Sequence, residues 1–226
     1  IDYLDDTQAV HIIGVGVDPE RVNCDRAAVR ALPIQAGIDM LLQAGGLAFL
    51  AHPAWSINTL ERVRGLQGLS GAEVYNTASG PPWNADRANS TSLLDMFASN
   101  GVRFPFIAVD DTHWYKGEAC RSFVQVQADG LSHESILEAL RLGRFYASQG
   151  PEIRQIELDE KRLVVHTGPA ARAIFSSNLP WVGARCKEGS DVTEWVYERN
   201  PARRETFIRC ELSDAEGRRA WTSPMV

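Results

Sequence analysis

The first half of this chain contains several short apolar runs, and each run ends at a glycine or a polar residue. They span residues 10–17, 47–51, 71–76 and 106–109. Apolar runs of this length without polar alternation are typical of strands buried on both faces of a sheet. Helical periodicity lies between them, over about 27–44, 58–65 and 92–100. Strands that alternate with helices at this spacing favour parallel βα units, as in a barrel or a doubly wound sheet.

The pattern changes after Pro151. Short segments, several of them alternating, occur at 153–158, 162–167, 172–176, 193–196 and 207–212, and turn residues separate them. This pattern predicts a small antiparallel β domain. We therefore expect a β/α barrel portion over residues 1–150 and a β domain over residues 151–226.

Composition and charge narrow the class of protein. The 226 residues are 44% hydrophobic and 23% charged, which is the ordinary globular range. The formal net charge of −6, without a stripe of Lys or Arg, does not favour binding to nucleic acid or to anionic membranes. No apolar run approaches the roughly 18–20 residues of a membrane span. A small-molecule substrate is the expected partner, and the oligomeric state stays open.

The four cysteines are widely spaced, at Cys24, Cys120, Cys186 and Cys210. They form no C-x-x-C pair, so a zinc ribbon, a redox motif and a disulfide scaffold are all disfavoured. We expect reduced and mostly buried thiols, and a cytoplasmic protein, or a secreted one if a signal segment lies upstream.

Side chains that can bind metals gather where the apolar runs end. His52 follows one run, Asp111 and His113 follow another, Asn76 closes a third, and His11 lies within the first. The C-terminal ends of parallel strands are where such folds build their sites. Imidazole nitrogens and carboxylate oxygens suit zinc, manganese or iron. Each residue also has a structural interpretation: a core histidine, a histidine before proline, or a helix cap.

Four motifs together resemble a known family. They are Ala-His-Pro at 51–53, Glu-Val-Tyr-Asn at 73–76, Asp-Asp-Thr-His at 110–113, and Gly-Arg-Phe-Tyr-Ala-Ser-Gln-Gly-Pro at 143–151. The combination is similar to the PHP (polymerase and histidinol phosphatase) superfamily, and the last motif resembles its carbaryl-hydrolase-like branch. The resemblance covers most of the chain.

The resemblance implies an α/β fold, a distorted (β/α)7 TIM-like barrel that carries two or three divalent ions of zinc, manganese or iron. His52 matches the ligand of the family's A-H-P motif, and Asp111 and His113 match the last ligand pair, which is also catalytic. His11 resembles the ligand of an H-x-x-G-x-G strand. Glu73 and Asn76 fall in a stretch that is expected to line the cavity, and for Glu73 the favoured interpretation is a buried carboxylate paired across the barrel.

One part of the family pattern is missing. Members open with H-x-H, then a further Asp and His, and then a bridging Glu ahead of the strand that contains His11. None of these is present in the sequence, and the two remaining histidines, His133 and His166, are expected at the surface. Either the barrel's N-terminal strands precede Ile1, or the chain is a degenerate member. An open half-barrel would expose strand edges, which favours the first interpretation.

The leading functional hypothesis is a phosphoesterase that uses metal-activated water on a phosphomonoester or phosphodiester. Asn76, Arg121 and Arg144 are its candidate substrate-binding residues. The alternative enzyme hydrolyses an ester, carbamate or amide, with four aromatic residues around an apolar pocket: Trp55, Trp83, Trp114 and Tyr115. A non-catalytic module that has lost its metals is the third hypothesis.

Overall fold

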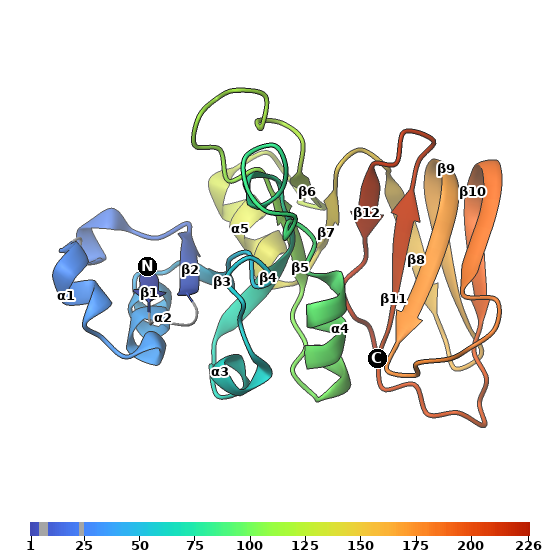
Figure 1. Cartoon of the computed structure of the whole chain (residues 1–226), viewed down its shortest axis with the longest axis horizontal. Helices are drawn as coiled ribbons and strands as arrows, with labels where there is room; N and C mark the ends of the chain where they lie inside the picture. Colours follow the sequence, from blue (N-terminus) through green and yellow to red (C-terminus); the bar gives the residue numbers. More distant parts are fainter. Residues whose placement is uncertain (5–8, 23–24) are drawn as a thin grey trace.

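Two sheets of different construction follow one another along the molecule (Figure 1). The computed structural model describes residues 1–4, 9–22 and 25–226. Within these residues the first sheet has the order β1-β2-β3-β4-β5 and the second the order β10-β9-β11-β12-β7-β6, with β8 paired to β9. The first sheet's strands are β1 (Asp2–Leu4), β2 (Ala9–Val15), β3 (Leu47–Leu50), β4 (Leu69–Asn76) and β5 (Phe106–Val109). The second sheet's are β6 (Phe123–Val126), β7 (Phe145–Ser148), β8 (Ile153–Leu158), β9 (Arg162–Ser177), β10 (Cys186–Glu198), β11 (Ile208–Ser213) and β12 (Arg219–Trp221).

The helices are short and lie between the strands. They are α1 (Arg26–Arg30), α2 (Ile34–Gln43), α3 (Leu60–Arg64), α4 (Thr91–Ser99) and α5 (His133–Arg141), with 3-10 turns η1 (Pro19–Arg21) and η2 (Thr77–Ser79). The predicted single helix over 27–44 is wrong, because Pro33 occupies the N-cap of α2 and separates it from α1. Proline disfavours helical geometry in the residue before it, so the helix cannot continue through Leu32.

The expected (β/α)7 barrel is wrong. The pairs β3–β4 and β4–β5 are parallel, as predicted, but β1–β2 and β2–β3 are antiparallel. On the far side of β5 come β6 and β7, which belong to the antiparallel second sheet. A closed barrel of βα units needs every neighbouring strand to run in the same direction, so this chain forms two open sheets instead.

The second sheet is antiparallel in all its described pairs. The strands predicted at 153–158 and 207–212 are present as β8 and β11, but those at 162–167 and 172–176 are one continuous strand, β9. β6 and β7 precede residue 151 and nevertheless pair within this sheet. The division at residues 150 and 151 stays a prediction.

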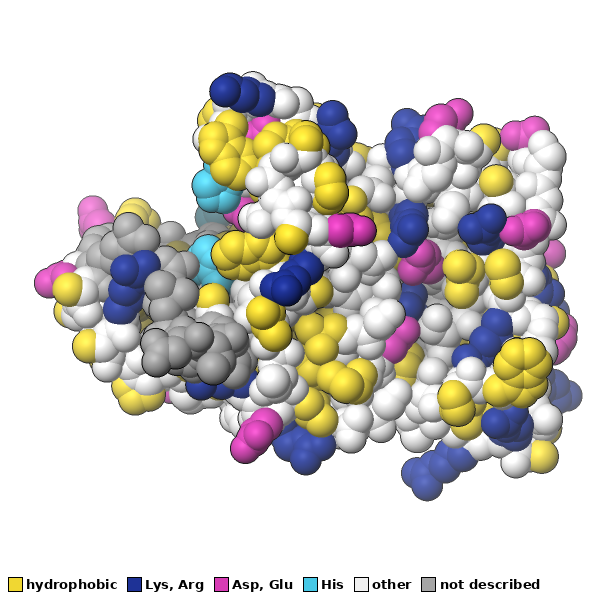
Figure 2. All heavy atoms as spheres, in the orientation of Figure 1, with side chains coloured by type: hydrophobic (Ala, Val, Ile, Leu, Met, Phe, Trp, Pro, Cys, Tyr) yellow, Lys and Arg dark blue, Asp and Glu magenta, His cyan; other side chains and the backbone are white. Residues whose placement is uncertain are grey.

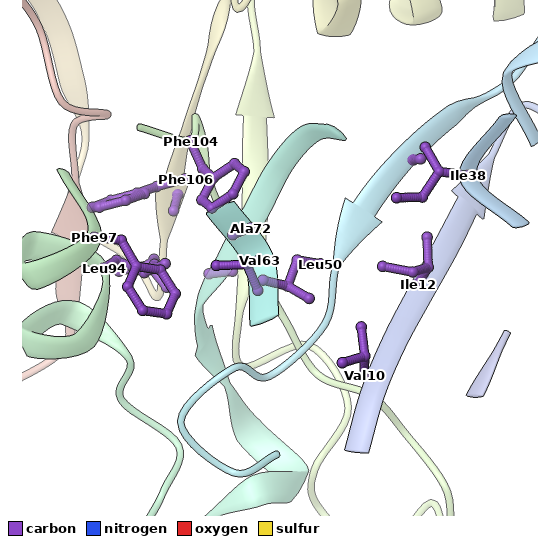
Figure 3. Packing of buried hydrophobic residues seen from close by; sticks show 14 of the residues in the cluster. Val10, Ile12, Ile38, Leu50, Val63, Ala72, Leu94, Phe97, Phe104 and Phe106 are labelled. Atoms are coloured by element: carbon purple, nitrogen blue, oxygen red, sulfur yellow. The ribbon is translucent and has the colours of Figure 1, made fainter. Parts of the chain in front are cut away.

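The first sheet buries both of its faces, because successive strand side chains point to opposite sides. Ala48 and Leu50 of β3 lie in one core with α2, α3 and α4, whereas Leu47 and Phe49 lie in another with α5, β6 and β7. Figure 3 shows the first of these cores, where Leu94 and Phe97 of α4 meet Phe104 and Phe106. Covering both faces accounts for strands that are apolar at every position.

Besides the packing of β6 and β7, two side chains of β11 and β12 join the second sheet to the first. Trp221 of β12 is fully buried in the first sheet's core, where its ring stacks on Tyr75 with centroids 5.7 Å apart. Arg209 of β11 is also buried, and its Nε and Nη2 donate to the two carboxylate oxygens of Asp95 on α4, at 2.6 and 2.7 Å. The guanidinium also lies 5.9 Å from the Phe106 ring. An apolar contact and a bidentate ion pair therefore add to the packing that holds the two sheets together.

Cys120 and Cys186 are exposed and Cys210 is buried, so the expectation of mostly buried thiols is wrong for two of these three, and Cys24 lies outside the described residues. Across the described ranges, no helix combines the length and apolar character needed to cross a bilayer.

We predict that Asp95→Ala destabilises the protein by about 3–5 kcal/mol, because it leaves the buried Arg209 charge without its bidentate partner. Urea unfolding followed by circular dichroism measures the loss, and Asp86→Ala in an exposed loop is the control. Adding Arg209→Met to Asp95→Ala should recover part of the stability, since it removes a buried charge whose remaining acidic partner is Glu211, 3.6 Å from Nη1. A loss below about 1 kcal/mol, the range of surface ion pairs, would contradict the prediction.

Candidate metal and substrate site

Four predicted metal ligands line one cavity of about 550 Å³. They are His11, His52, Asp111 and His113. Trp55, Trp114, Asn84 and small residues complete its wall. In Figure 2 histidine side chains (cyan) reach the surface beside hydrophobic side chains (yellow). The fold thus gathers donors from three distant parts of the chain at a partly apolar opening.

His11 and His52 form the first donor pair. Their strands β2 and β3 are antiparallel neighbours, and the backbone N–H of Ala51 donates to the His11 carbonyl, which places the two rings side by side. His11 Nδ1 and His52 Nε2 lie 3.1 Å apart. This is a hydrogen-bond distance, and it is also close to the ~3.3 Å between two imidazole nitrogens on one tetrahedral zinc. His52 Nδ1 lies 2.8 Å from Ser56 Oγ, which fixes the orientation of the ring.

A buried carboxyl group links this pair to Asp111. Glu73 Oε2 accepts from the backbone N–H of His52 at 2.7 Å and from Asn76 Nδ2 at 2.8 Å. The same Asn76 amide donates to Asp111 Oδ2 at 3.2 Å, while its oxygen accepts from the Ser79 N–H. Glu73 Oε1 has no hydrogen-bond partner among the described residues. Burial raises the pKa of Glu73 from 4.5 to about 8, against the lowering effect of the Asn76 and His52 hydrogen bonds.

The backbone at His52 and Asp111 is strained. Their φ angles are 28° and 53°, in a region that L-residues other than glycine rarely adopt. Such conformations cost on the order of 1–3 kcal/mol each and persist where the surroundings hold them. At His52 the hydrogen bond to Glu73 supplies part of that restraint, and at Asp111 the hydrogen bond from Asn76 does so.

Asp111 and His113 form the second donor pair, on an exposed loop after β5. His113 Nδ1 lies 2.6 Å from the Asp111 carbonyl oxygen, which can only accept, so Nδ1 carries the proton and the neutral ring keeps its lone pair on Nε2. The fully buried Glu118 carboxylate accepts from four backbone N–H groups of the loop, at His113, Trp114, Tyr115 and Lys116.

Burial acts to raise the pKa of Glu118, but the backbone N–H donors outweigh it and lower the pKa to about 2. The loop is therefore built around an ionised carboxylate. Neither Glu118 nor Ser56 was predicted as a site residue from the sequence. Each acts through hydrogen bonds whose partners depend on the path of the loop, and no motif marks either position.

The lining has donor types that suit a divalent ion of zinc, manganese or iron. Three imidazoles and one carboxylate face the cavity, in two pairs. Within the part of the chain that the structure describes, no three His, Cys, Asp or Glu side chains lie together closely enough to hold a metal ion. The donor chemistry fits a metal, and the described residues bring the donors together two at a time.

The other candidate residues lie elsewhere. Asn76 is buried behind Asp111, with both ends of its amide bonded to protein groups. Arg121 lines a neighbouring cavity, and Arg144 lines a third, between β6, β7 and β8. His133 is exposed, and His166 pairs with Glu157 and Glu194 in the second sheet.

We predict that Glu73→Gln weakens the pH dependence of stability of the metal-free protein. A folded-state pKa of about 8 against 4.5 means that this group's contribution is fully present below pH 4.5 and is lost as pH rises through 8. Glutamine has the shape of the protonated acid and does not titrate. Urea midpoints from pH 5 to 9 in EDTA should fall less steeply for Glu73→Gln than for wild type or the exposed control Glu61→Gln. Parallel curves would count against this assignment.

We predict that Glu118→Gln loosens the loop that holds His113, because an amide oxygen cannot replace a carboxylate that accepts four N–H donors. Hydrogen exchange at residues 113–116 should be faster than in wild type. Glu138→Gln, on the exposed face of α5, should leave the exchange unchanged. Equal protection in all three proteins would refute the assigned role of Glu118.

The similarity of this chain to known proteins is weak. No protein-family model matches the chain, and no curated protein matches it. A solved structure from Bacteroides vulgatus ATCC 8482, a two-domain protein containing a predicted PHP-like metal-dependent phosphoesterase, is 13% identical over 95% of this chain and 74% of that one. Its TM-score is 0.34.

Proposed function

We propose that this protein is a metal-dependent hydrolase, and that its substrate is a phosphomonoester or phosphodiester bound in the cavity lined by the histidines. One observation carries the proposal: His11, His52, Asp111 and His113, from distant parts of the sequence, line the same cavity. His11 and His52 would hold a metal through Nδ1 and Nε2, and Asp111 and His113 through a carboxylate oxygen and Nε2. A bound divalent ion lowers the pKa of water toward neutrality and neutralises charge on a phosphate.

The chain's own residues supply the positioning. Ser56 orients the His52 ring, and Asn76 orients the Asp111 carboxylate. His113 Nδ1 is directed at the Asp111 carbonyl, so the ring presents Nε2 to the cavity as the nitrogen that would bind the metal. The His113 side chain is 57% exposed, so that nitrogen is open to a metal ion entering from solvent.

A second candidate function is hydrolysis of an ester, carbamate or amide. Trp55 and Trp114 line the same cavity and could contact an apolar acyl or leaving group. The same activated water would attack a carbonyl carbon. The two functions share the donors and differ in substrate, so a substrate panel separates them.

We predict that the protein binds zinc or manganese and hydrolyses p-nitrophenyl phosphate or bis(p-nitrophenyl) phosphate. His52→Ala and His113→Ala should each lose bound metal and about a hundredfold or more in turnover, because each removes a donor. Metal content by mass spectrometry and release of nitrophenol are the measurements. His133→Ala, at an exposed histidine outside the cavity, is the matched control.

p-Nitrophenyl acetate and a 1-naphthyl carbamate complete the panel. Turnover of these alone would favour the second function. A protein that binds no metal, or a His113→Ala variant that keeps both metal and activity, would overturn the proposal in favour of a non-catalytic module.

A further inference from the structure

A second cavity of about 320 Å³ lies beside the first, and the proposed hydrolysis does not use it. Its wall includes one side chain of β4 and others from the turns and loops next to β4, β6, β7 and β12: Tyr75, Thr77, Trp83, Arg121, Gln149 and Arg218. Aromatic and guanidinium side chains therefore line a space large enough for a small organic molecule.

The same turns and loops line both cavities, each with different residues. Thr77 faces the second cavity, and its neighbours Ala78 and Ser79 in the same 3-10 turn face the first. Trp83 lines the second cavity, and the next residue, Asn84, lines the first. The loop after β5 lines the first cavity with His113 and the second with Arg121. The cavities are neighbours, yet they have different residues and different chemistry.

Arg121 is the cation available to a ligand in this second cavity. Its guanidinium lies 5.3 Å from the centre of the Trp83 ring, and its Nε donates to the Gly117 carbonyl. Among the described residues it has no acidic partner, and its two terminal nitrogens make no hydrogen bond. These two nitrogens form the planar fork that binds a carboxylate or phosphate through two parallel hydrogen bonds.

The backbone around Arg121 is held in advance of binding. One carboxylate, that of Asp110, accepts from the backbone N–H groups of Cys120, Arg121 and Ser122, the last two at 2.9 and 2.8 Å. Ser122 is buried, and its hydroxyl lies 2.8 Å from the hydroxyl of Thr77. A ligand of Arg121 would therefore meet a backbone that is already ordered, which lowers the entropic cost of binding.

The other polar groups at or beside this cavity already have partners. Arg218 donates from Nε to Asp214 at 2.7 Å and from Nη2 to Glu216 at 3.2 Å. The Asp110 carboxylate is occupied by the three backbone donors. The Gln149 amide donates to Ser122 and accepts from the Arg219 N–H. Among the described residues that line this cavity, Arg121 is the cation whose side chain has no acidic partner.

We propose that this second cavity is a binding site for a small organic oxyanion, a carboxylate or phosphate joined to a flat apolar group. Arg121 binds the oxyanion through its terminal nitrogens. The apolar group packs against the half-buried side chains of Tyr75 and Trp83, since planar groups lie well against aromatic surfaces. The site requires no metal and no catalysis, so it stands apart from the proposed hydrolase function.

The test uses the full chain treated with EDTA, in both wild type and His52→Ala, so that neither metal nor turnover contributes. Calorimetric titration with benzoate and with phenyl phosphate should give saturable binding to at least one of them, and the neutral benzamide should not bind. Arg121→Ala should weaken that binding about 10- to 100-fold, because a charge-assisted pair is lost. Arg144→Ala, at an exposed arginine in another cavity, should bind as wild type does.

Arg121→Lys keeps the charge and loses the fork, so it should bind less tightly than wild type and more tightly than Arg121→Ala. Thermal melts check that each variant is folded. Binding that is unchanged in Arg121→Ala, binding reduced equally in Arg144→Ala, or no saturable binding of either ring-bearing anion would overturn the proposal.

Discussion

The candidate site depends on the hydrogen bonds of one buried carboxyl group, that of Glu73. It lies between β3 and β5, where its Oε2 accepts from the His52 backbone and from Asn76, which in turn holds Asp111. Burial favours the uncharged acid, which costs less to keep away from water than a carboxylate. A single side chain on the central strand β4 thus links the two donor pairs and helps hold two residues at positive φ.

Strand β4 is held in place by packing, because both faces of its sheet are covered. α2, α3 and α4 pack on one side, and α5, β6 and β7 pack on the other. The second sheet is anchored to this layer by Trp221 in the core and by the pair of Arg209 with Asp95. Loops at the ends of β3, β4 and β5 can therefore hold strained and exposed side chains, because the strands beneath them are fixed by packing.

These loops separate two cavities of different chemistry. Imidazole and carboxylate groups face one, and a guanidinium held by the Asp110 loop faces the other. Two carboxylates organise the loop after β5: Asp110 binds the N–H groups of residues 120–122, and Glu118 binds those of residues 113–116. A loop without regular structure is thereby ordered by charge-assisted hydrogen bonds.

The sequence alone determined the local features. Apolar runs predicted β3 and β5 to within one residue, and the ligand-type side chains at their ends do meet at one cavity. The sequence could not determine strand direction or sheet membership. β2 pairs with β3 antiparallel, and β6 and β7 belong to the second sheet, so the prediction of a barrel was wrong. Periodicity reports which side chains are buried, whereas direction and partner depend on contacts between distant residues, such as Asp95 with Arg209. Only the tertiary structure placed Arg121 and Arg144 at different cavities and assigned Glu118 its role, because these depend on how the loops pack.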